Sequence, residues 1–275
     1  MRLLNIAPDG LSLTFTKDFV EQEIPPYVIL SHTWGNDGHE VLYKDIAEKQ
    51  PYDDFVEGTD KDGYKKIRFC AKQARAEGFE YMWIDSCCID KPSYTELTHA
   101  LNSMFRWYNK AAKCYVYLPD VSTDNVPEEI WKSKFHNTRW ARRGWTLQEL
   151  LAPPRVEFFS SEGRKIGNKT TLESLLHSMT GIAIGALRGT PLCEFSEIER
   201  MSWMERRETK LPEDKAYALL GIFDVQMSLI YGEGERTAFA RLRETIKQYS
   251  GRIEPAESKL AMQTNPCVRT VANVL

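Results

Sequence analysis

The sequence has no apolar run long enough to cross a membrane and no marked excess of charge of either sign. No stretch reaches the roughly 18 apolar residues that a membrane-spanning helix needs. The 36 Lys and Arg and 39 Asp and Glu give a net charge of −3, which offers no electrostatic basis for binding nucleic acid. The first ten residues lack the apolar core of a signal peptide. We therefore expect a cytoplasmic protein with no membrane span and no nucleic-acid partner.

Cysteine is also scarce, with 6 irregularly spaced residues among 275. Because none of them forms a Cys-x-x-Cys pair, neither a disulfide scaffold nor a zinc site is expected, and we predict no metal ion. Hydrophobic residues make up 42% of the chain and charged residues 27%, a composition typical of globular domains.

Strand-like and helix-like segments alternate in the first half of the chain. Short apolar runs at 27–31, 81–85, 114–118 and 156–159 predict buried strands, and helical periodicity at 67–74 and 97–108 separates the first three of them. This order predicts an α/β fold with a parallel sheet covered by helices on both faces. In such a sheet, ligands bind beyond the carboxyl ends of the strands.

The second half carries helical periodicity instead, at 172–179, 196–207, 212–223 and 235–248. We therefore divide the chain into an N-terminal lead-in (1–23), an α/β core (24–165), a C-terminal helical elaboration (166–248) and a disordered or truncated tail (249–275).

Polar residues follow the first two predicted strands. Ser31, His32 and Trp34 come after the first, where they form either a ligand-facing loop or a turn with Trp34 packed on a helix. Asp85 ends the second strand and either caps the following turn or holds a polar ligand group. Cys87 and Cys88 follow it, as packed thiols or as a nucleophile near His32.

The stretch 140–149 is the most informative part of the sequence. If it is helical, Trp145 and Glu149 lie on one face, four residues apart. Thr146 and Glu149 also fit a capping box, which would make Glu149 purely structural. Arg143 is either a phosphate ligand or a solvated side chain.

These residues resemble the HET (heterokaryon incompatibility) domain of fungal nonself-recognition proteins. The resemblance is carried by PPYVILSHTWG (25–35), IRFCAKQARAEGFEYMWIDSCCIDK (67–91), the segment 96–121 and RWARRGWTLQELLAP (139–153), and it extends to about residue 245 through LPEDKAYALLGIFDV and LIYGEGERTAFARLRE. The resemblance implies an effector domain that triggers regulated cell death after incompatible cells fuse, a form of innate immunity. In this family an upstream sensor often accompanies the domain.

A more distant resemblance links the chain to TIR domains, which have a flavodoxin-like sheet. VILSHTWGND resembles the first TIR strand and its loop, and GWTLQEL resembles the pattern around the TIR catalytic glutamate, which falls here on Glu149. Several TIR domains cleave NAD. The chain departs from the pattern at Thr146, where TIR domains often have Cys, and carries a long insertion between Gly35 and Tyr64.

The leading hypothesis is a TIR-like NAD glycohydrolase that self-association switches on. NAD would be its substrate rather than a cofactor, with Glu149 catalytic and Ser31, His32, Trp34, Asp85, Arg143 and Trp145 binding the substrate. The alternative is a non-catalytic signalling or oligomerisation module, and a third hypothesis is a hydrolase using Cys87 or Cys88. The residues do not distinguish NAD from NADP.

Overall fold

The computed structural model describes residues 1–251 apart from 11, 36–37 and 49–60. The described residues form a mixed seven-stranded sheet in the order β2-β1-β4-β3-β5-β6-β7. The strands are β1 (Leu4–Ile6), β2 (Leu13–Phe15), β3 (Val28–His32), β4 (Tyr81–Trp83), β5 (Lys113–Tyr117), β6 (Val156–Phe159) and β7 (Lys165–Asn168).

The four central strands are the apolar runs that the sequence predicts, and they are parallel to one another. β3 pairs with β4 and β5, and β5 pairs with β6. All five residues of β3 and all four of β6 are buried, as expected for strands covered on both faces. This confirms the α/β class.

The sheet is not parallel throughout, because β1, β2 and β7 add antiparallel edges. The segment 1–23, set apart as a lead-in, therefore contributes β1 and β2 to the sheet. β7 begins at the boundary placed between residues 165 and 166. These edge strands are three or four residues long, too short to show a clear alternation of apolar and polar residues.

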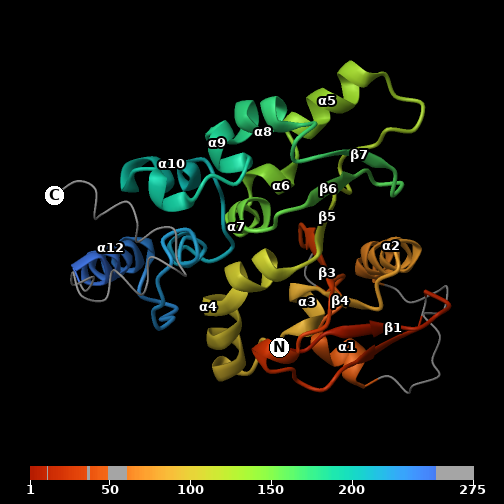
Figure 1. Ribbon diagram of the computed structural model, residues 1–275, viewed down its shortest axis with the longest axis horizontal. Helices are drawn as coiled ribbons and strands as arrows, with labels where there is room; N and C mark the ends of the chain where they lie inside the picture. The colour runs from red at the N-terminus through yellow and green to blue at the C-terminus, as the bar shows by residue number, and fades with distance from the viewer. Residues whose placement is uncertain (11, 36–37, 49–60, 252–275) are drawn as a thin grey trace.

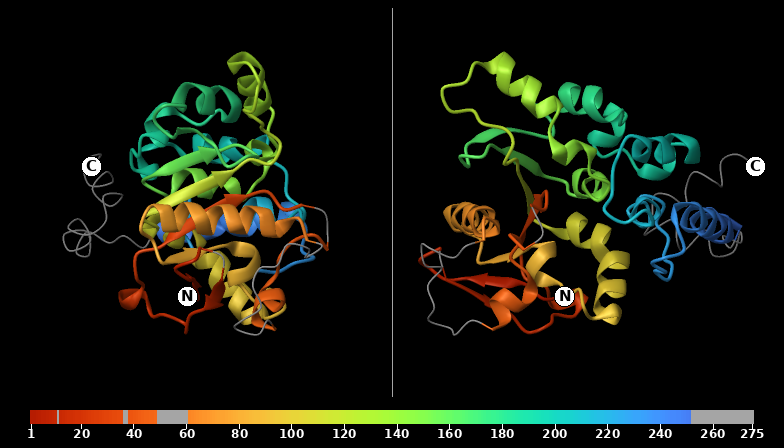
Figure 2. Two further views of the ribbon diagram at one scale, coloured as in Figure 1. Left: turned by 90° about the vertical axis from the view of Figure 1, so that its right-hand side faces the viewer. Right: turned by 180° about the vertical axis from the view of Figure 1, so that it is seen from behind.

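Helices cover both faces of the central strands and extend beyond one end of the sheet. Figures 1 and 2 show α2 on one face and α4 and α7 on the other, with α8 to α12 lying on the side of α4 and α7. The helices are α1 (Tyr43–Ala47), α2 (Gly63–Ala76), α3 (Asp85–Cys88), α4 (Tyr94–Lys110), α5 (Glu128–His136), α6 (Arg139–Arg142), α7 (Thr146–Leu151), α8 (Glu173–Thr180), α9 (Ile184–Leu187), α10 (Glu197–Glu205), α11 (Asp214–Tyr217) and α12 (Glu235–Gly251).

Helical periodicity correctly predicts α2, α4, α8, α10 and α12. Ser93 caps α4 by accepting a hydrogen bond from the backbone N–H of Glu96, as the Ser-x-x-Glu pattern indicates. The expected helix over 212–223 is shorter, because only α11 is helical and turns follow it. In the predicted tail, α12 continues to Gly251, and residues 252–275 lie outside the described part of the chain. No helix among the described residues is both long and apolar enough to span a membrane.

Candidate functional site

Ser31 and Glu149 meet at the carboxyl end of the central strands, although 118 residues separate them. The Ser31 hydroxyl donates a 2.5 Å hydrogen bond to Oε2 of Glu149 and accepts one of 2.7 Å from Nε1 of Trp140. Ser31 is the fourth residue of β3, and Glu149 lies on α7, which covers that face of the sheet. The strand and the helix therefore place a carboxylate where ligands bind in folds of this class.

Glu149 lies in a closed environment, with 4% of its surface exposed. Burial is the main cause that raises the pKa of Glu149 to about 7, and the negative charge of Asp85 raises it further. Hydrogen bonds from Ser31 and Tyr108 and the positive charge of Arg143 act in the opposite direction. The carboxyl therefore changes charge near neutral pH, a property typical of acid–base and electrostatic catalysts.

The structure also decides against the capping box at Thr146 and Glu149. The Thr146 hydroxyl lies 2.6 Å from the carbonyl oxygen of Trp140 and 2.7 Å from that of Arg143, and no side chain caps α7. Glu149 points to Ser31 instead of back along its own helix. Its position is thus set by the sheet and not by helix capping.

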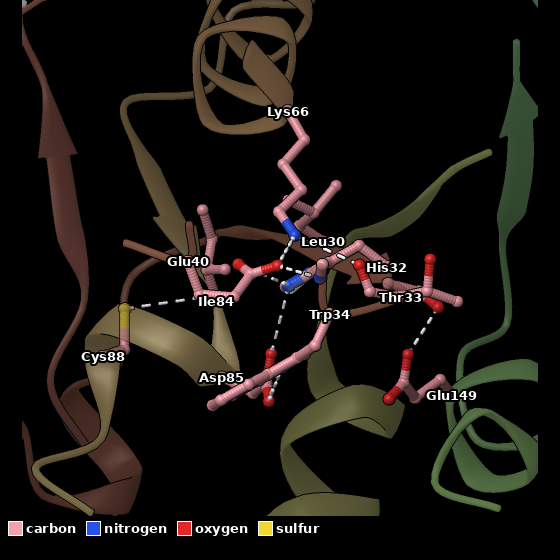
Figure 3. A network of polar contacts seen from close by, with 12 residues as sticks. Leu30, His32, Thr33, Trp34, Glu40, Lys66, Ile84, Asp85, Cys88 and Glu149 are labelled. Carbon is pink, nitrogen blue, oxygen red and sulfur yellow. Dashed lines mark hydrogen bonds and ion pairs between the residues drawn. The ribbon is translucent and has the colours of Figure 1, made fainter. Parts of the chain in front are cut away.

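His32, one residue after Ser31, lies on the opposite face of β3, because successive strand residues point to opposite faces. Its Nε2 is 3.8 Å from Oε2 of Glu40 and 3.8 Å from Oδ1 of Asp85. Lys66 of α2 forms an ion pair with Glu40 and donates to the carbonyl oxygen of Thr33. Figure 3 shows this cluster on the far side of the strand from Glu149.

The structure therefore does not bring His32 to Glu149. Burial, followed by the charge of Lys66, lowers the pKa of His32 well below its ordinary value, so the ring is neutral at pH 7. A neutral ring on the opposite face is badly placed to polarise a group bound at Glu149. The nearby Glu40 accepts a 2.6 Å hydrogen bond from the backbone N–H of Gly35 and so fixes the end of the Trp34 loop.

Trp34 and Asp85, which follow β3 and β4, lie beside the cluster of His32, Glu40 and Lys66 (Figure 3). The indole N–H of Trp34 donates a 3.0 Å hydrogen bond to Asp85. Lys91 binds the same carboxylate at 3.2 Å and places its ammonium 3.7 Å from the centre of the Trp34 ring. Arg143 lies 6.0 Å from that ring. An aromatic ring and two cations thus lie together at this end of the sheet.

Burial alone would raise the pKa of Asp85, but Lys91, His32 and Arg143 together hold it below its ordinary value. Asp85 is therefore ionised at pH 7, and its charge acts on both His32 and Glu149. The carboxylate also orients Trp34 by accepting the indole hydrogen bond. Asp85 thus holds Trp34 and Lys91 in place instead of capping the turn that follows β4.

Trp145 is not free to stack on a ligand. Its exposed fraction is 9%, and its side chain hydrogen-bonds Asp214, which also accepts a 3.0 Å bond from the Tyr231 hydroxyl. Of the two tryptophans expected to contact a substrate, Trp34 is half-buried and therefore the more exposed one.

Cys87 and Cys88 lie within α3 and are buried. The four residues of α3, which follow the short strand β4, form a single helical turn. Burial raises the pKa of the Cys87 thiol well above its ordinary value, and the Cys88 sulfur accepts a hydrogen bond from the backbone N–H of Ile84. These contacts are typical of packed thiols and disfavour a thiolate nucleophile.

Several residues that shape the site were not singled out from the sequence. They are Trp140, Tyr108, Glu40, Lys66, Lys91 and Arg207. Trp140 opens the stretch 140–149 but was given no role there, and a single basic residue on a helix gives no signal that it is buried. Among the described residues, no group of three or more His, Cys, Asp or Glu side chains is arranged to hold a metal ion.

Comparison with known proteins identifies the family. Residues 27–130 match the family model described as "Heterokaryon incompatibility protein (HET)". The chain is also 52% identical over 254 residues to the vegetative incompatibility protein HET-E-1 of Podospora anserina, an alignment that covers 91% of this chain. The chain belongs to the HET family. No solved structure shows a significant match to it.

The HET family model spans the elements from β3 to the beginning of α5, and so includes Ser31, Trp34 and Asp85 but not Glu149. The HET chain covers 18% of the length of HET-E-1. Two residues outside the family model, Trp140 and Glu149, nevertheless complete the contacts of Ser31. The candidate site of this HET domain therefore depends on more of the chain than the matched segment.

Proposed function

We propose that this HET domain acts in heterokaryon incompatibility, triggering regulated cell death as a TIR-like enzyme that hydrolyses NAD at the nicotinamide–ribose bond. The observation that carries the proposal is the buried carboxylate of Glu149, which points to Ser31 at the carboxyl end of the parallel strands. The half-buried Trp34, with Lys91 and Arg143 beside it, fits a ligand that has aromatic rings and a diphosphate.

The chemistry needs one well-placed carboxylate. When the bond between ribose C1′ and the pyridinium nitrogen breaks, its electron pair leaves with nicotinamide, which becomes neutral, and the ribose acquires oxocarbenium character. The ionised Glu149 carboxylate stabilises this positive charge. Water then adds to C1′ and gives up a proton, which Glu149 accepts, so that nicotinamide, ADP-ribose and a proton are the products.

Access to the carboxylate is restricted in the described conformation, because Glu149 is 4% exposed and already bonded to Ser31. Binding of the ribose therefore requires Ser31 to give way to a substrate hydroxyl. We propose that self-association of the domain, under the control of a sensor, favours this open arrangement. The specific activity should then rise with protein concentration.

The test compares wild type, Glu149→Gln and Glu205→Gln in an assay of nicotinamide release from NAD at high protein concentration. Glu205 is an exposed residue of α10 and controls for the loss of one carboxylate. Release by the wild type and the control but not by Glu149→Gln supports the proposal, provided that all three proteins are folded. Parallel assays with NADP decide between the two dinucleotides.

The burial of Glu149 also favours a second candidate, a non-catalytic signalling module whose crevice stays closed. In that case no protein releases nicotinamide, and Glu149→Gln still kills cells when expressed. The combined substitution of Cys87 and Cys88 by Ala tests cysteine chemistry in the same assays.

A further inference from the structure

Arg207 joins the C-terminal helical region to the helix that carries Glu149. It lies two residues after the end of α10 and is 3% exposed. Its Nε donates to the carbonyl oxygen of Trp203, while its Nη1 donates to the carbonyl oxygen of Arg143 at 2.8 Å and to the Thr146 hydroxyl at 2.9 Å. One planar guanidinium therefore links the end of α10 to the beginning of α7.

The backbone on either side of Arg207 strengthens this link. Residues 142–144 run beside residues 207–209: the N–H of Gly144 donates to the carbonyl oxygen of Glu208 at 2.8 Å, and the N–H of Glu208 donates to that of Arg142. A Cβ added to Gly144 would lie 2.5 Å from Cγ2 of Thr209. The two segments thus leave no room between them, and the start of α7 is fixed by residues beyond position 166.

Arg207 also brings a positive charge into the interior near Glu149. Burial lowers the pKa of Arg207 to about 10, and the negative charge of Glu149 opposes that decrease. Among the described residues, Nη2 of Arg207 has no hydrogen-bond acceptor. The charged or titratable groups that surround Glu149 are Asp85, Arg143, Tyr108, Cys114 and Arg207.

We propose that Arg207 is a positioning residue for Glu149: it holds the beginning of α7 against β3 and supplies positive charge that favours the ionised carboxylate. The helical region after residue 166 would then complete the candidate site instead of merely covering the sheet. The catalytic consequence rests on the proposed NAD hydrolysis, whereas the effect on Glu149 itself does not.

The experiment uses the full chain with Arg207→Gln, Arg207→Lys and the matched control Arg206→Gln, since Arg206 is the exposed neighbour. The titration of Glu149 is followed by carbon NMR of glutamate-labelled protein, with the resonance assigned by its loss in Glu149→Gln. Hydrogen exchange of the α7 amides and the pH profile of nicotinamide release are measured on the same proteins.

We expect Arg207→Gln to raise the pKa of Glu149 by about one unit and to move the acidic limb of the rate profile upward by the same amount. Arg207→Lys keeps the charge but loses the planar fork, so the titration stays close to wild type while the α7 amides exchange about tenfold faster. Arg206→Gln should behave as wild type in all three measurements.

An unchanged Glu149 titration in folded Arg207→Gln would overturn the proposal. If that variant does not fold, Arg207→Lys decides, because wild-type exchange of the α7 amides would show that the guanidinium does not position the helix. Failure of the wild type to release nicotinamide, with the NMR and exchange effects present, would contradict the proposed hydrolysis but not the role of Arg207.

Discussion

Replacing Glu149 by Gln should make the protein more stable at alkaline pH, although it removes the proposed catalytic group. The structure raises the pKa of Glu149 from 4.5 to about 7, chiefly through burial. At about 1.4 kcal/mol per unit, this shift means that the ionised carboxylate lowers the free energy of unfolding by about 3 kcal/mol. Glutamine has a similar shape, accepts a hydrogen bond from Ser31 and carries no charge to bury.

The direction of this stability difference follows from the linkage between proton binding and folding. Because the folded pKa lies above the unfolded value, the contribution of Glu149 to stability is fully present below 4.5 and is lost as pH rises through about 7. The variant should therefore be more stable than wild type by only about 1 kcal/mol near about pH 5, but by about 3 kcal/mol near about pH 8. For a chain of this size, that difference corresponds to a melting temperature higher by roughly 6–10 °C.

The assay is urea unfolding of wild type, Glu149→Gln and Glu205→Gln, each measured from about pH 5 to about pH 8. The difference in free energy of unfolding between two of these proteins at each pH cancels the contributions of all titratable groups that they share. The Glu205→Gln control should differ little from wild type, because its carboxylate is exposed on α10. A wild-type protein as stable as Glu149→Gln at the alkaline end would refute the argument, since it would mean that the ionised carboxylate is not penalised by burial.

Three further predictions concern the groups around the site. Ser31→Ala removes a hydrogen bond that lowers the pKa of Glu149, so the acidic limb of the nicotinamide-release profile should move to higher pH; Asp85→Asn removes a negative charge and should move it to lower pH. Shifts of both variants in the same direction would contradict this electrostatic account. Lys66→Met leaves Glu40 buried without its ion-pair partner and should lower the free energy of unfolding by about 3–5 kcal/mol in urea. The double variant Lys66→Met/Glu40→Leu should recover most of the free energy of unfolding that Lys66→Met loses. Lys66→Met as stable as wild type would show that the ion pair is not buried in solution.

The central strands were predictable because each is a continuous apolar run buried on both faces. The edge strands were not, since β1 and β2 are three residues each and β7, with the sequence KIGN, is only partly buried. Short edge strands form because a neighbouring strand offers backbone hydrogen bonds, and their own sequence carries little information about that. The single turn of α3 escaped prediction for a similar reason.

The candidate site, like the fold, could be predicted from the sequence only in part. Ser31 and Glu149 were both candidate site residues, and the structure brings them together at the carboxyl end of β3. Which face of a strand each neighbouring residue occupies depends on register, and here it separates His32 from Glu149. Arg207 could not be found from the sequence, because a basic residue after an amphipathic helix is usually solvated.

The distribution of buried charge distinguishes this edge of the sheet from ordinary packing. Glu149 and Arg207 are each nearly inaccessible, and burial disfavours the charged form of both. Replacing buried ionic groups by apolar side chains of similar volume is often neutral or stabilising, so the fold gains little stability from these residues. Two charges that lower stability, Glu149 hydrogen-bonded to Ser31 and Arg207 hydrogen-bonded to Thr146, lie near the edge where parallel sheets bind ligands, and this placement supports the proposed chemistry.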